Sequence, residues 1–220
     1  MGRGAGPPDP QQAGPRRRIT GLHTAFAVAV LLAVAVVALV MAVALPVNQL
    51  TQPGGVVPVA LAHDAADQAL GAVDSLPDDT YLEATPDSTV FRLQVAMLPW
   101  SLRLLTEAPA ALRAVCVGLG ALALARLLLS FRDGRPFDRQ NPRLLVALAV
   151  LLLAGGVGGG VLDDLVQQVV LDHVGAGSAG TFTSRGTVDL TSVVLAVVLL
   201  ALADVFRRGR QLDEDVQGLV

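Results

Sequence analysis

The sequence predicts an all-α integral membrane protein whose four transmembrane helices form two pseudo-repeated hairpins, with a small loop region outside the membrane that holds a β-hairpin. One observation behind this prediction is composition. Ala, Val and Leu make up most of the hydrophobic 53% of the 220 residues and gather in four long apolar blocks, which is the signature of membrane spans. The second observation is a short polar pattern that follows the second block and returns after the fourth.

The repeated pattern starts with a Phe-Arg pair, has a glycine three positions after the phenylalanine and ends in an apolar residue followed by Asp. The aligned positions are Phe131 with Phe206, Gly134 with Gly209, and Phe137 with Leu212, at a constant offset of 75 residues. Because each copy directly follows an apolar block, we expect two equivalent halves that end in the same segment. The alternative is that any span ending in an aromatic residue, Arg and Gly shows this similarity without a structural repeat.

The first apolar block follows a tail without apolar periodicity. Residues 1–20 are rich in Pro, Gly and Gln and carry three consecutive arginines at 16–18, so we expect a disordered tail. Residues 25–45 then run for 21 positions without a polar side chain, which at about 1.5 Å per residue crosses a hydrocarbon core of roughly 30 Å. A cleaved signal peptide is the alternative, because Ala-Val-Ala at 42–44 resembles a cleavage site, but the apolar region of a signal is normally only about 7–15 residues long.

Residues 47–98 change to an acidic composition with seven Asp or Glu. Segments 80–82 and 89–95 alternate between apolar and polar residues and are separated by a turn sequence at 85–88, which predicts a short β-hairpin. The acidic residues lack the spacing of a calcium-binding loop, so they predict a solvated surface rather than a metal site. Trp100 and the leucines that follow it are typical of an element at the membrane–water interface that leads into the second span.

The second span is interrupted by Arg113 and Arg126, but both lie near its ends, where a long arginine side chain reaches the headgroups. The polar loop after this span contains signals that end and restart a helix. Gly134 suits a helix C-terminus that needs a left-handed residue, and Asn141 before Pro142 suits an N-cap followed by proline at the first helical position. We therefore expect the loop to stop one helix and to start the next.

The third span holds a glycine cluster in its second half. Gly155, Gly156, Gly159 and Gly160 form two overlapping G-x-x-x-G pairs, and small residues at this spacing let helix backbones approach closely in lipid. We therefore predict that these glycines pack against a neighbouring helix, with a flexible hinge as the alternative. Beyond residue 162 apolar pairs recur every four residues, so the helix is expected to continue out of the membrane with one apolar face.

The fourth span carries Asp204 near its end. A carboxylate just inside the hydrocarbon is costly unless it is paired. If the two copies of the repeat lie at equal depth, Arg126 comes within about 4.5 Å of Asp204 along the helix axis. An ion pair between Asp204 and Arg126 across the bundle is therefore one expectation. The other is a local pair with Arg207 or Arg208, three and four positions further along the same helix.

Arginine is distributed unequally between the two sides of a four-span chain. All sixteen basic residues are Arg. Eleven fall on the side of the N-terminus, three fall on the other side, and Arg113 and Arg126 lie within the second span. Arginine-rich short loops stay in the cytoplasm, so both termini are expected there, with the protein in the bacterial plasma (inner) membrane. The predicted division is a cytoplasmic tail 1–20, spans at about 23–46, 109–131, 143–163 and 187–206, outer loops 47–108 and 164–186, an inner loop 132–142 and a cytoplasmic tail 207–220.

Two motifs support a resemblance to known proteins. The middle loop reads Gly-x-x-Phe-x-x-x-Asn, and the last span ends in an acidic-x-Phe-x-x-Gly-x-x-Leu pattern. Their residues are Gly134, Phe137 and Asn141, after Phe131, and Asp204, Phe206, Gly209 and Leu212. On these residues the chain resembles a family of bacterial four-helix inner-membrane proteins classed as a domain of unknown function. The resemblance covers roughly residues 20–220 and implies four spans, and it carries no activity or ligand.

Enzyme chemistry is not predicted. His23, His63 and His173 are scattered without metal-ligand spacing, and the single Cys116 lies inside an apolar block. No catalytic residue, cofactor or metal is therefore expected. The arginines flank spans rather than forming a basic face for nucleic acid, so nucleic-acid binding is not expected either. The expected partners are the lipid bilayer, a cytoplasmic regulatory protein or a second copy of this chain.

The sequence favours a non-enzymatic accessory, sensory or regulatory membrane protein. A small transporter or channel subunit is the alternative, because pseudo-repeated hairpins occur in transporters. Against transport, Arg113, Arg126 and Asp204 all lie near span ends, and the sequence does not show the charged or broken-helix site at the midplane that a transporter would have. An intramembrane enzyme is the third hypothesis.

Overall fold

The computed structural model describes residues 16–51, 55–61, 80–84, 90–95, 98–133, 138–174, 182–183 and 189–217. Within these residues four helices are long and apolar enough to cross a membrane, namely His23–Thr51, Trp100–Arg132, Asn141–His173 and Leu190–Gln211. The predicted all-α fold with four spans is therefore confirmed. Apolar runs of this length form helices because a backbone in lipid must satisfy its own hydrogen-bonding groups.

Each span belongs to a longer helical stretch. The bounds are Arg16–Thr51 for α1, Trp100–Arg132 for α3 and Leu190–Gln217 for α6, and the third span runs through α4 (Asn141–Leu153), a π-helical segment (Ala154–Gly158) and α5 (Gly159–Val174). The expected continuation of the third span beyond residue 162 corresponds to α5. The expected interfacial element at Trp100 is the first part of α3 itself and not a separate element.

The start of α1 differs from the expected disordered tail. The three arginines at 16–18 form its first turn, and only residues 1–15 of the expected tail lie outside the described residues. The physical reason is that a long apolar helix is already nucleated. Adding one turn to its end costs far less free energy than starting a new helix.

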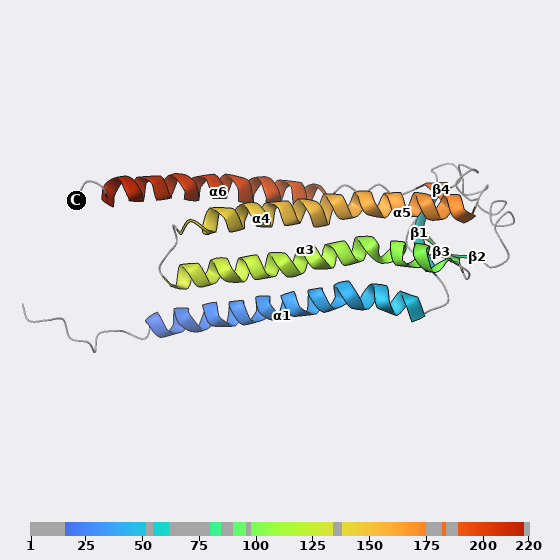
Figure 1. The fold of residues 1–220 in the computed structure, drawn as a ribbon, viewed down its shortest axis with the longest axis horizontal. Helices are drawn as coiled ribbons and strands as arrows, with labels where there is room; N and C mark the ends of the chain where they lie inside the picture. The colour runs from blue at the N-terminus through green and yellow to red at the C-terminus, as the bar shows by residue number, and fades with distance from the viewer. Residues whose placement is uncertain are drawn as a thin grey trace, which may run out of the picture.

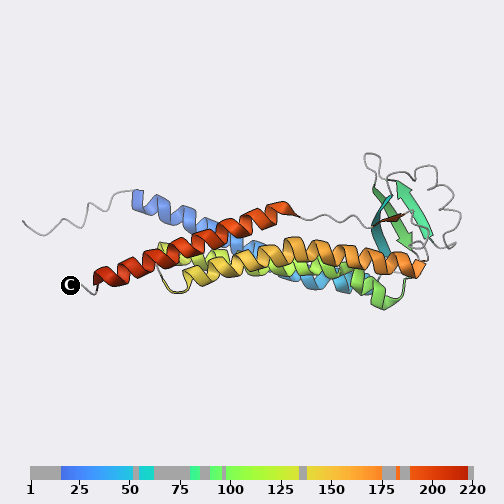
Figure 2. The ribbon, with the colours of Figure 1, turned by 90° about the horizontal axis from the view of Figure 1, so that it is seen from above.

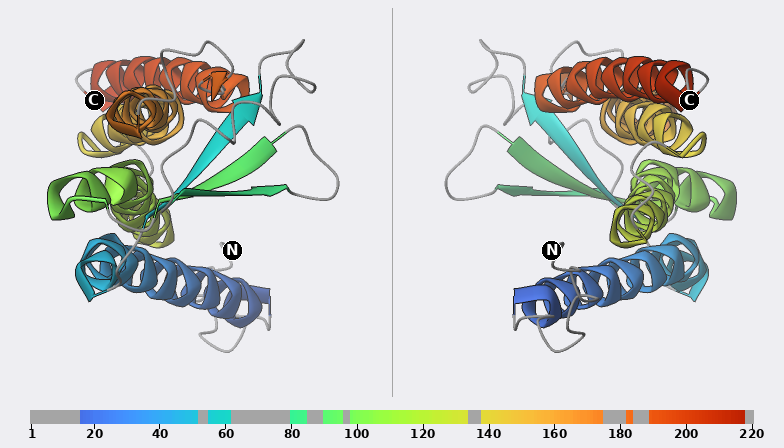
Figure 3. Two further views of the ribbon diagram at one scale, coloured as in Figure 1. Left: turned by 90° about the vertical axis from the view of Figure 1, so that its right-hand side faces the viewer. Right: turned by 90° about the vertical axis from the view of Figure 1, so that its left-hand side faces the viewer.

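The four long helices lie side by side in a row (Figure 1). α1 packs on α3, α3 packs on α4 and α5, and α4 packs on α6. The end-on views place α1 and α6 at the two extremes of the row (Figure 3). The contact of α1 with α3 is the most extensive, and α3 meets the third span along α4, the π-helical segment and α5. The two hairpins, α1 with α3 and the third span with α6, are therefore joined along α3 and the third span.

The two ends of the row differ in what they carry. All strands lie beside the end where α1 stops and α3 starts, which we call the sheet end (Figure 2). The opposite end, where α3 stops at Arg132 and α4 starts at Asn141, is called the arginine end. Because α5 runs on to Val174, the third span projects to the sheet (Figure 2).

The strands form one antiparallel sheet in the order β2-β3-β1-β4. The predicted β-hairpin is confirmed by β2 (Thr80–Ala84) and β3 (Val90–Val95), which pair with Thr80 opposite Val95. β1 (Gly55–Leu61) and β4 (Phe182–Thr183) were not predicted. Proline inside a run argues against a strand because it cannot donate a ladder hydrogen bond. Among the described residues, β4 pairs only with Ala60 and Leu61 of β1, so the side of β1 that faces β4 has no strand partner at Pro58.

The two copies of the repeated pattern meet, but they do not end their helices in the same way. The rings of Phe131 and Phe206 stack with 5.9 Å between centroids and 14° between planes, so both lie at the same depth. α3 ends within the first copy, at its Phe-Arg pair, whereas α6 continues through the second copy to Gln217. The expectation that both copies stop a helix is therefore wrong for the second. Gly209 costs a helix only about 1 kcal/mol relative to alanine, and no proline follows it, whereas two prolines follow the glycine of the first copy.

The arginine end is held by buried apolar side chains from both hairpins. α3, α4 and α6 each contribute one fully buried residue, and further leucines and an aromatic ring pack around these three. The members of this arginine-end core are Leu127, Leu145 and Ala203, with Leu144, Leu199 and Phe206 packed against them. The core therefore joins the two hairpins next to the phenylalanine stack.

Candidate functional site

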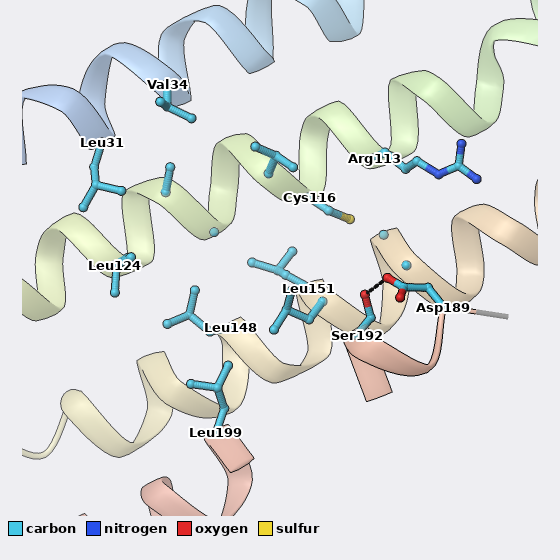
Figure 4. Close-up of a pocket in the computed structure, with 16 residues that line it drawn as sticks. Leu31, Val34, Arg113, Cys116, Leu124, Leu148, Leu151, Asp189, Ser192 and Leu199 are labelled. Atoms are coloured by element: carbon cyan, nitrogen blue, oxygen red, sulfur yellow. Dashed lines mark hydrogen bonds between the residues drawn. The ribbon is translucent and has the colours of Figure 1, made fainter. Parts of the chain in front are cut away.

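A cavity of about 670 Å³, which we call the hairpin cavity, lies between the two hairpins. Its walls come from α1, α3, α4, the π-helical segment and α6 (Figure 4). Most of its lining is apolar, including Leu31 from α1, Leu124 from α3, Leu148 from α4 and Leu199 from α6. Ligand pockets for small molecules typically measure about 300–1,000 Å³, so this cavity is large enough for a ligand.

The hairpin cavity becomes polar toward the sheet end. Arg113 of α3 lies there together with Asp189 and Ser192, the residues at the start of α6 (Figure 4). The Nη2 atom of Arg113 is 3.2 Å from the Oδ2 atom of Asp163 at the start of α5. This sheet-side part of the cavity, which we call the polar mouth, therefore holds one arginine, one carboxylate and a hydroxyl group, and the carboxylate of Asp163 pairs with the arginine from outside the lining.

Helix geometry places this polar mouth about one membrane thickness from the arginine end. Arg113 precedes Arg132, the last residue of α3, by nineteen positions, and Asp189 precedes Arg207 by eighteen. At about 1.5 Å per residue both separations are about 28 Å, close to the thickness of the hydrocarbon core. If the arginine end lies at one surface, the polar mouth lies at the other. The leucine-lined part of the cavity then lies inside the bilayer.

Asp189 caps α6 as well as lining the cavity. Its Oδ1 atom accepts a hydrogen bond from the backbone N–H of Thr191 at 3.1 Å, and its Oδ2 atom accepts one from the hydroxyl of Ser192. The hydrogen bond from Ser192 is the main reason that the pKa of Asp189 lies below its usual value. The ionised form is favoured, so the stabilising cap is present above the ordinary aspartate pKa and is lost as the pH falls through the lowered pKa.

The first two glycines of the cluster let α3 and α6 approach the third span beside the cavity. A Cβ atom on Gly156 would overlap the hydroxyl of Ser192 and would lie 2.5 Å from the Cβ atom of that residue. A Cβ atom on Gly155 would lie 3.0 Å from the Cβ atom of Cys116. Both glycines are therefore positions of close helix contact, with α6 and with α3 respectively.

The later glycines of the cluster lie beside the charged mouth. A Cβ atom on Gly159 would lie 2.9 Å from the Nε atom of Arg113, and Gly160 is buried next to it. The segment Ala154–Gly158, which contains the first two glycines of the cluster, is π-helical. Its hydrogen bonds connect residues five positions apart, instead of four as in an α-helix. Such segments occur frequently at functional sites, which makes the cavity beside it the candidate site.

The predicted ion pair of Asp204 forms locally. The Nη2 atom of Arg208 lies 2.8 Å from the Oδ2 atom of Asp204, one turn earlier on α6. The cross-bundle pair with Arg126 is therefore not the one that forms, and the Arg126 side chain is exposed. The i, i+4 spacing brings the two groups together on one helix, so no second helix is needed to compensate the carboxylate.

The remaining motif residues lie at the arginine end, away from the cavity. Asn141 is 1% exposed and is the first residue of α4; Gln140 is the N-cap, so the expected cap position is shifted by one residue. The backbone N–H of Asn141 donates a hydrogen bond to the carbonyl of Asp138 at 3.1 Å, which holds the loop against the helix. Gly134 and Phe137 lie outside the described residues, and Gly209 and Leu212 belong to α6.

Sequence reasoning missed the polar mouth of the cavity. It placed Arg113 near a span end and did not pair this residue with Asp163. A usable signal was present, because both residues lie about one membrane thickness from the arginine-rich loop between their helices. Asp189 and Ser192 carry the spacing of an N-cap and its third residue, which also went unused.

The lining of the hairpin cavity suits an amphipathic molecule. Within the described residues, no three His, Cys, Asp or Glu side chains gather closely enough to hold a metal ion. The apolar part of the cavity suits a hydrocarbon group, and its polar mouth offers a cation and a carboxylate to a polar group.

A row of four long apolar helices with strands at one end defines a multi-pass membrane protein. Residues 90–218 match the family described as Protein of unknown function (DUF2975), and the chain belongs to this family. The match begins at β3 and includes the last three spans. It is shorter than the expected resemblance over roughly residues 20–220, and α1 lies outside it. No curated protein and no solved structure matches the chain.

Proposed function

We propose that this protein is a non-enzymatic sensory or regulatory protein of the bacterial plasma membrane, and that the hairpin cavity receives its ligand. The observation that carries the proposal is the position of Leu199. This side chain lines the cavity and also packs against the arginine-end core. A ligand that displaces Leu199 therefore changes the contact that joins the two hairpins.

The ligand that fits this cavity is an amphipathic molecule that arrives from the sheet side of the membrane. Its apolar part would lie among the leucines, and its polar group would contact Arg113, Asp189 or Ser192. The output would be a change in the arrangement of α3, α4 and α6 at the arginine end. A cytoplasmic regulatory protein or a second copy of the chain would detect this change.

The arginine distribution supports a cytoplasmic arginine end. Eleven arginines lie in the segments on that side and three on the sheet side, as expected for cytoplasmic loops. A reporter that is active only in the cytoplasm should work when fused to Val220 and should be inactive when inserted near Asp78. Activity near Asp78 with none at Val220 would overturn this orientation.

The test of the sensory proposal is to fill the cavity without a ligand. A Cβ atom on Gly120 has only one neighbour within 4 Å, the Cδ2 atom of Leu148 at 3.8 Å, so Gly120→Leu can place a side chain in the cavity. Spin labels at Asp133→Cys and Gln211→Cys, in a Cys116→Ala background, report the distance between α3 and α6 at the arginine end. We expect Gly120→Leu to shift this distance distribution in reconstituted protein.

The matched control adds bulk to the neighbouring residue outside the cavity. Leu119 is 43% exposed and does not line the cavity, so Leu119→Phe should leave the distance distribution as in the parent protein. Equal distributions for all three proteins would contradict the proposed coupling between the cavity and the arginine end.

Transport is a second candidate function because of one observation. A regular helix was expected throughout the third span, but this span is interrupted by the π-helical segment beside the cavity, and irregular helices line transporter sites. Flux across liposomes distinguishes the two functions. Protein-dependent uptake of an amphipathic probe into the liposomes that Gly120→Leu abolishes would favour transport. Binding of the probe to the protein without uptake into the liposomes would favour sensing.

A further inference from the structure

We propose that the arginine end carries a second site, a pocket that binds a phosphate group at the membrane surface. A separate cavity of about 380 Å³ lies there between the start of α4 and α6. Four of its six lining residues are arginines. These residues are Arg139, Arg143, Arg207 and Arg210, together with Pro142 and Val146. The proposal does not depend on the function proposed for the hairpin cavity.

The arginines of α6 are divided between two faces of the helix. Arg208 points to Asp204 and forms the i, i+4 ion pair described above. Arg207 and Arg210 are three positions apart, a spacing that places two side chains on one helix face, and both line the pocket. Arg208 therefore points to a different face of α6 from the two arginines that line the pocket.

The chemistry of the lining favours a multivalent oxyanion. Guanidinium groups stay protonated at any ordinary pH and bind phosphate oxygens through two parallel N–H groups. Four guanidinium groups line one space, so a multivalent oxyanion placed there can contact several of them at once. The first turn of α4, at Pro142 and Arg143, adds the partial positive charge of a helix N-terminus.

The position of the pocket points to phosphate rather than to another anion. Positive charge beside a span is expected on the cytoplasmic side, where arginines reach the headgroups singly. A cavity with four converging arginines goes beyond this general preference. Basic pockets between transmembrane helices on the cytoplasmic side bind the headgroups of anionic lipids. A phospholipid headgroup and a free phosphate share the chemistry that these arginines recognise, so the experiment must separate the two.

The first arm of the test uses lipid. The full chain is placed in nanodiscs of phosphatidylcholine with or without phosphatidylglycerol, and native mass spectrometry counts the phosphatidylglycerol molecules that stay bound. Arg143→Gln/Arg210→Gln should lower this retention at least about tenfold, the factor that corresponds to losing one charge-assisted hydrogen bond. Arg126→Gln/Arg132→Gln removes two arginines of α3 that do not line the pocket and should retain phosphatidylglycerol like the wild type.

The second arm uses inorganic phosphate in nanodiscs of phosphatidylcholine alone. If a free phosphate is the ligand, inorganic phosphate raises the thermal stability of the wild type above that in chloride at equal ionic strength, and the pocket variant shows no increase. Retention of phosphatidylglycerol without this increase assigns the pocket to a lipid headgroup. Arg207→Gln serves as a milder second variant if the double variant does not fold.

Two results would overturn the proposal. One is that neither phosphatidylglycerol nor inorganic phosphate binds the wild type. The other is that the pocket variant and the α3 control lose binding to the same extent, because the effect would then come from overall charge rather than from the pocket. The melting temperature of each variant in phosphatidylcholine alone shows whether it is folded.

Discussion

The arginine end and the sheet end of the helix row are held together by different interactions. At the arginine end, α3, α4 and α6 meet through buried Leu127, Leu145 and Ala203, and the two phenylalanine rings stack beside them. Toward the sheet end, the same helices surround a cavity and meet through glycine contacts and polar groups. In lipid, helix association depends on close packing, so the two regions should differ in rigidity.

This difference assigns a role to each region. The arginine-end core resembles a fixed junction, because three helices contribute side chains that leave little space. The cavity region can accept added volume, as shown by the open space around Gly120. The chain therefore has a packed junction at the arginine end and a cavity that can accept added volume nearer to the sheet end. Four sets of substitutions can break or sharpen this comparison.

The largest effect is expected in the arginine-end core. Leu145 is 1% exposed, so Leu145→Ala removes side-chain contacts from all three helices and should destabilise the protein by about 2–5 kcal/mol. Val146→Ala, at a neighbouring residue that is 38% exposed, should cost much less. Thermal unfolding in detergent measures both. Equal losses would mean that the core is no more tightly packed than the surface facing lipid.

A somewhat smaller effect is expected at the glycine contact with α6. Gly156→Ala forces a methyl group against Ser192 and should cost about 1–3 kcal/mol, as overpacked substitutions do. Gly158→Ala is the control, because its Cβ atom would meet only a carbonyl oxygen at 3.8 Å. Adding Ser192→Gly to Gly156→Ala should recover part of the loss. The contact has no structural role if both glycine variants unfold at the same temperature.

The phenylalanine stack should contribute less than the core. Offset aromatic pairs contribute about 0.5–1.5 kcal/mol beyond their burial, so Phe131→Ala and Phe206→Ala should show a coupling of that size in a double-mutant cycle. Phe26, which is 71% exposed on α1, provides the control pair with Phe206 and should show no coupling. Additive losses for Phe131 and Phe206 would remove the stack as a link between the two copies of the repeat.

The smallest effect is expected for the ion pair at the polar mouth. The side chains of Arg113 and Asp163 are 44% and 37% exposed, and exposed pairs contribute only about 0.2–1 kcal/mol. Arg113→Gln and Asp163→Asn should therefore show a weak coupling that decreases as salt is added. A coupling that salt does not change would mean that the mouth is buried more deeply than the helix lengths indicate.

Several parts of the fold could be predicted from local sequence. The four spans follow from apolar runs that have no other stable state in lipid, and β2 and β3 follow from alternation around a turn. β1 was missed because a proline, Pro58, interrupts its run of β-branched residues. β4 was missed because two residues are too few to show the alternation of apolar and polar residues that identifies a strand. The extension of α6 was missed because one glycine was given the weight of a helix stop, although it acted together with prolines in the first copy.

The candidate site was less predictable than the fold. The glycine spacing indicated a close contact, but it could not identify Ser192 and Cys116 as the side chains opposite. The cavity arises where small residues on one helix face small residues on another, and this depends on the order of helices in the row. The ion pair of Asp204, in contrast, was predictable, because its partner Arg208 lies four positions later on the same helix.

The most direct test of the difference between the two regions uses the single native cysteine. Cys116 lines the hairpin cavity, whereas Leu127 lies in the arginine-end core, so Leu127→Cys in a Cys116→Ala background provides a second thiol for comparison. In proteoliposomes we expect N-ethylmaleimide to modify Cys116 much faster than Cys at position 127, and Gly120→Leu to slow the reaction of Cys116. Equal rates at the two positions, or no effect of Gly120→Leu, would contradict an accessible cavity beside a closed junction.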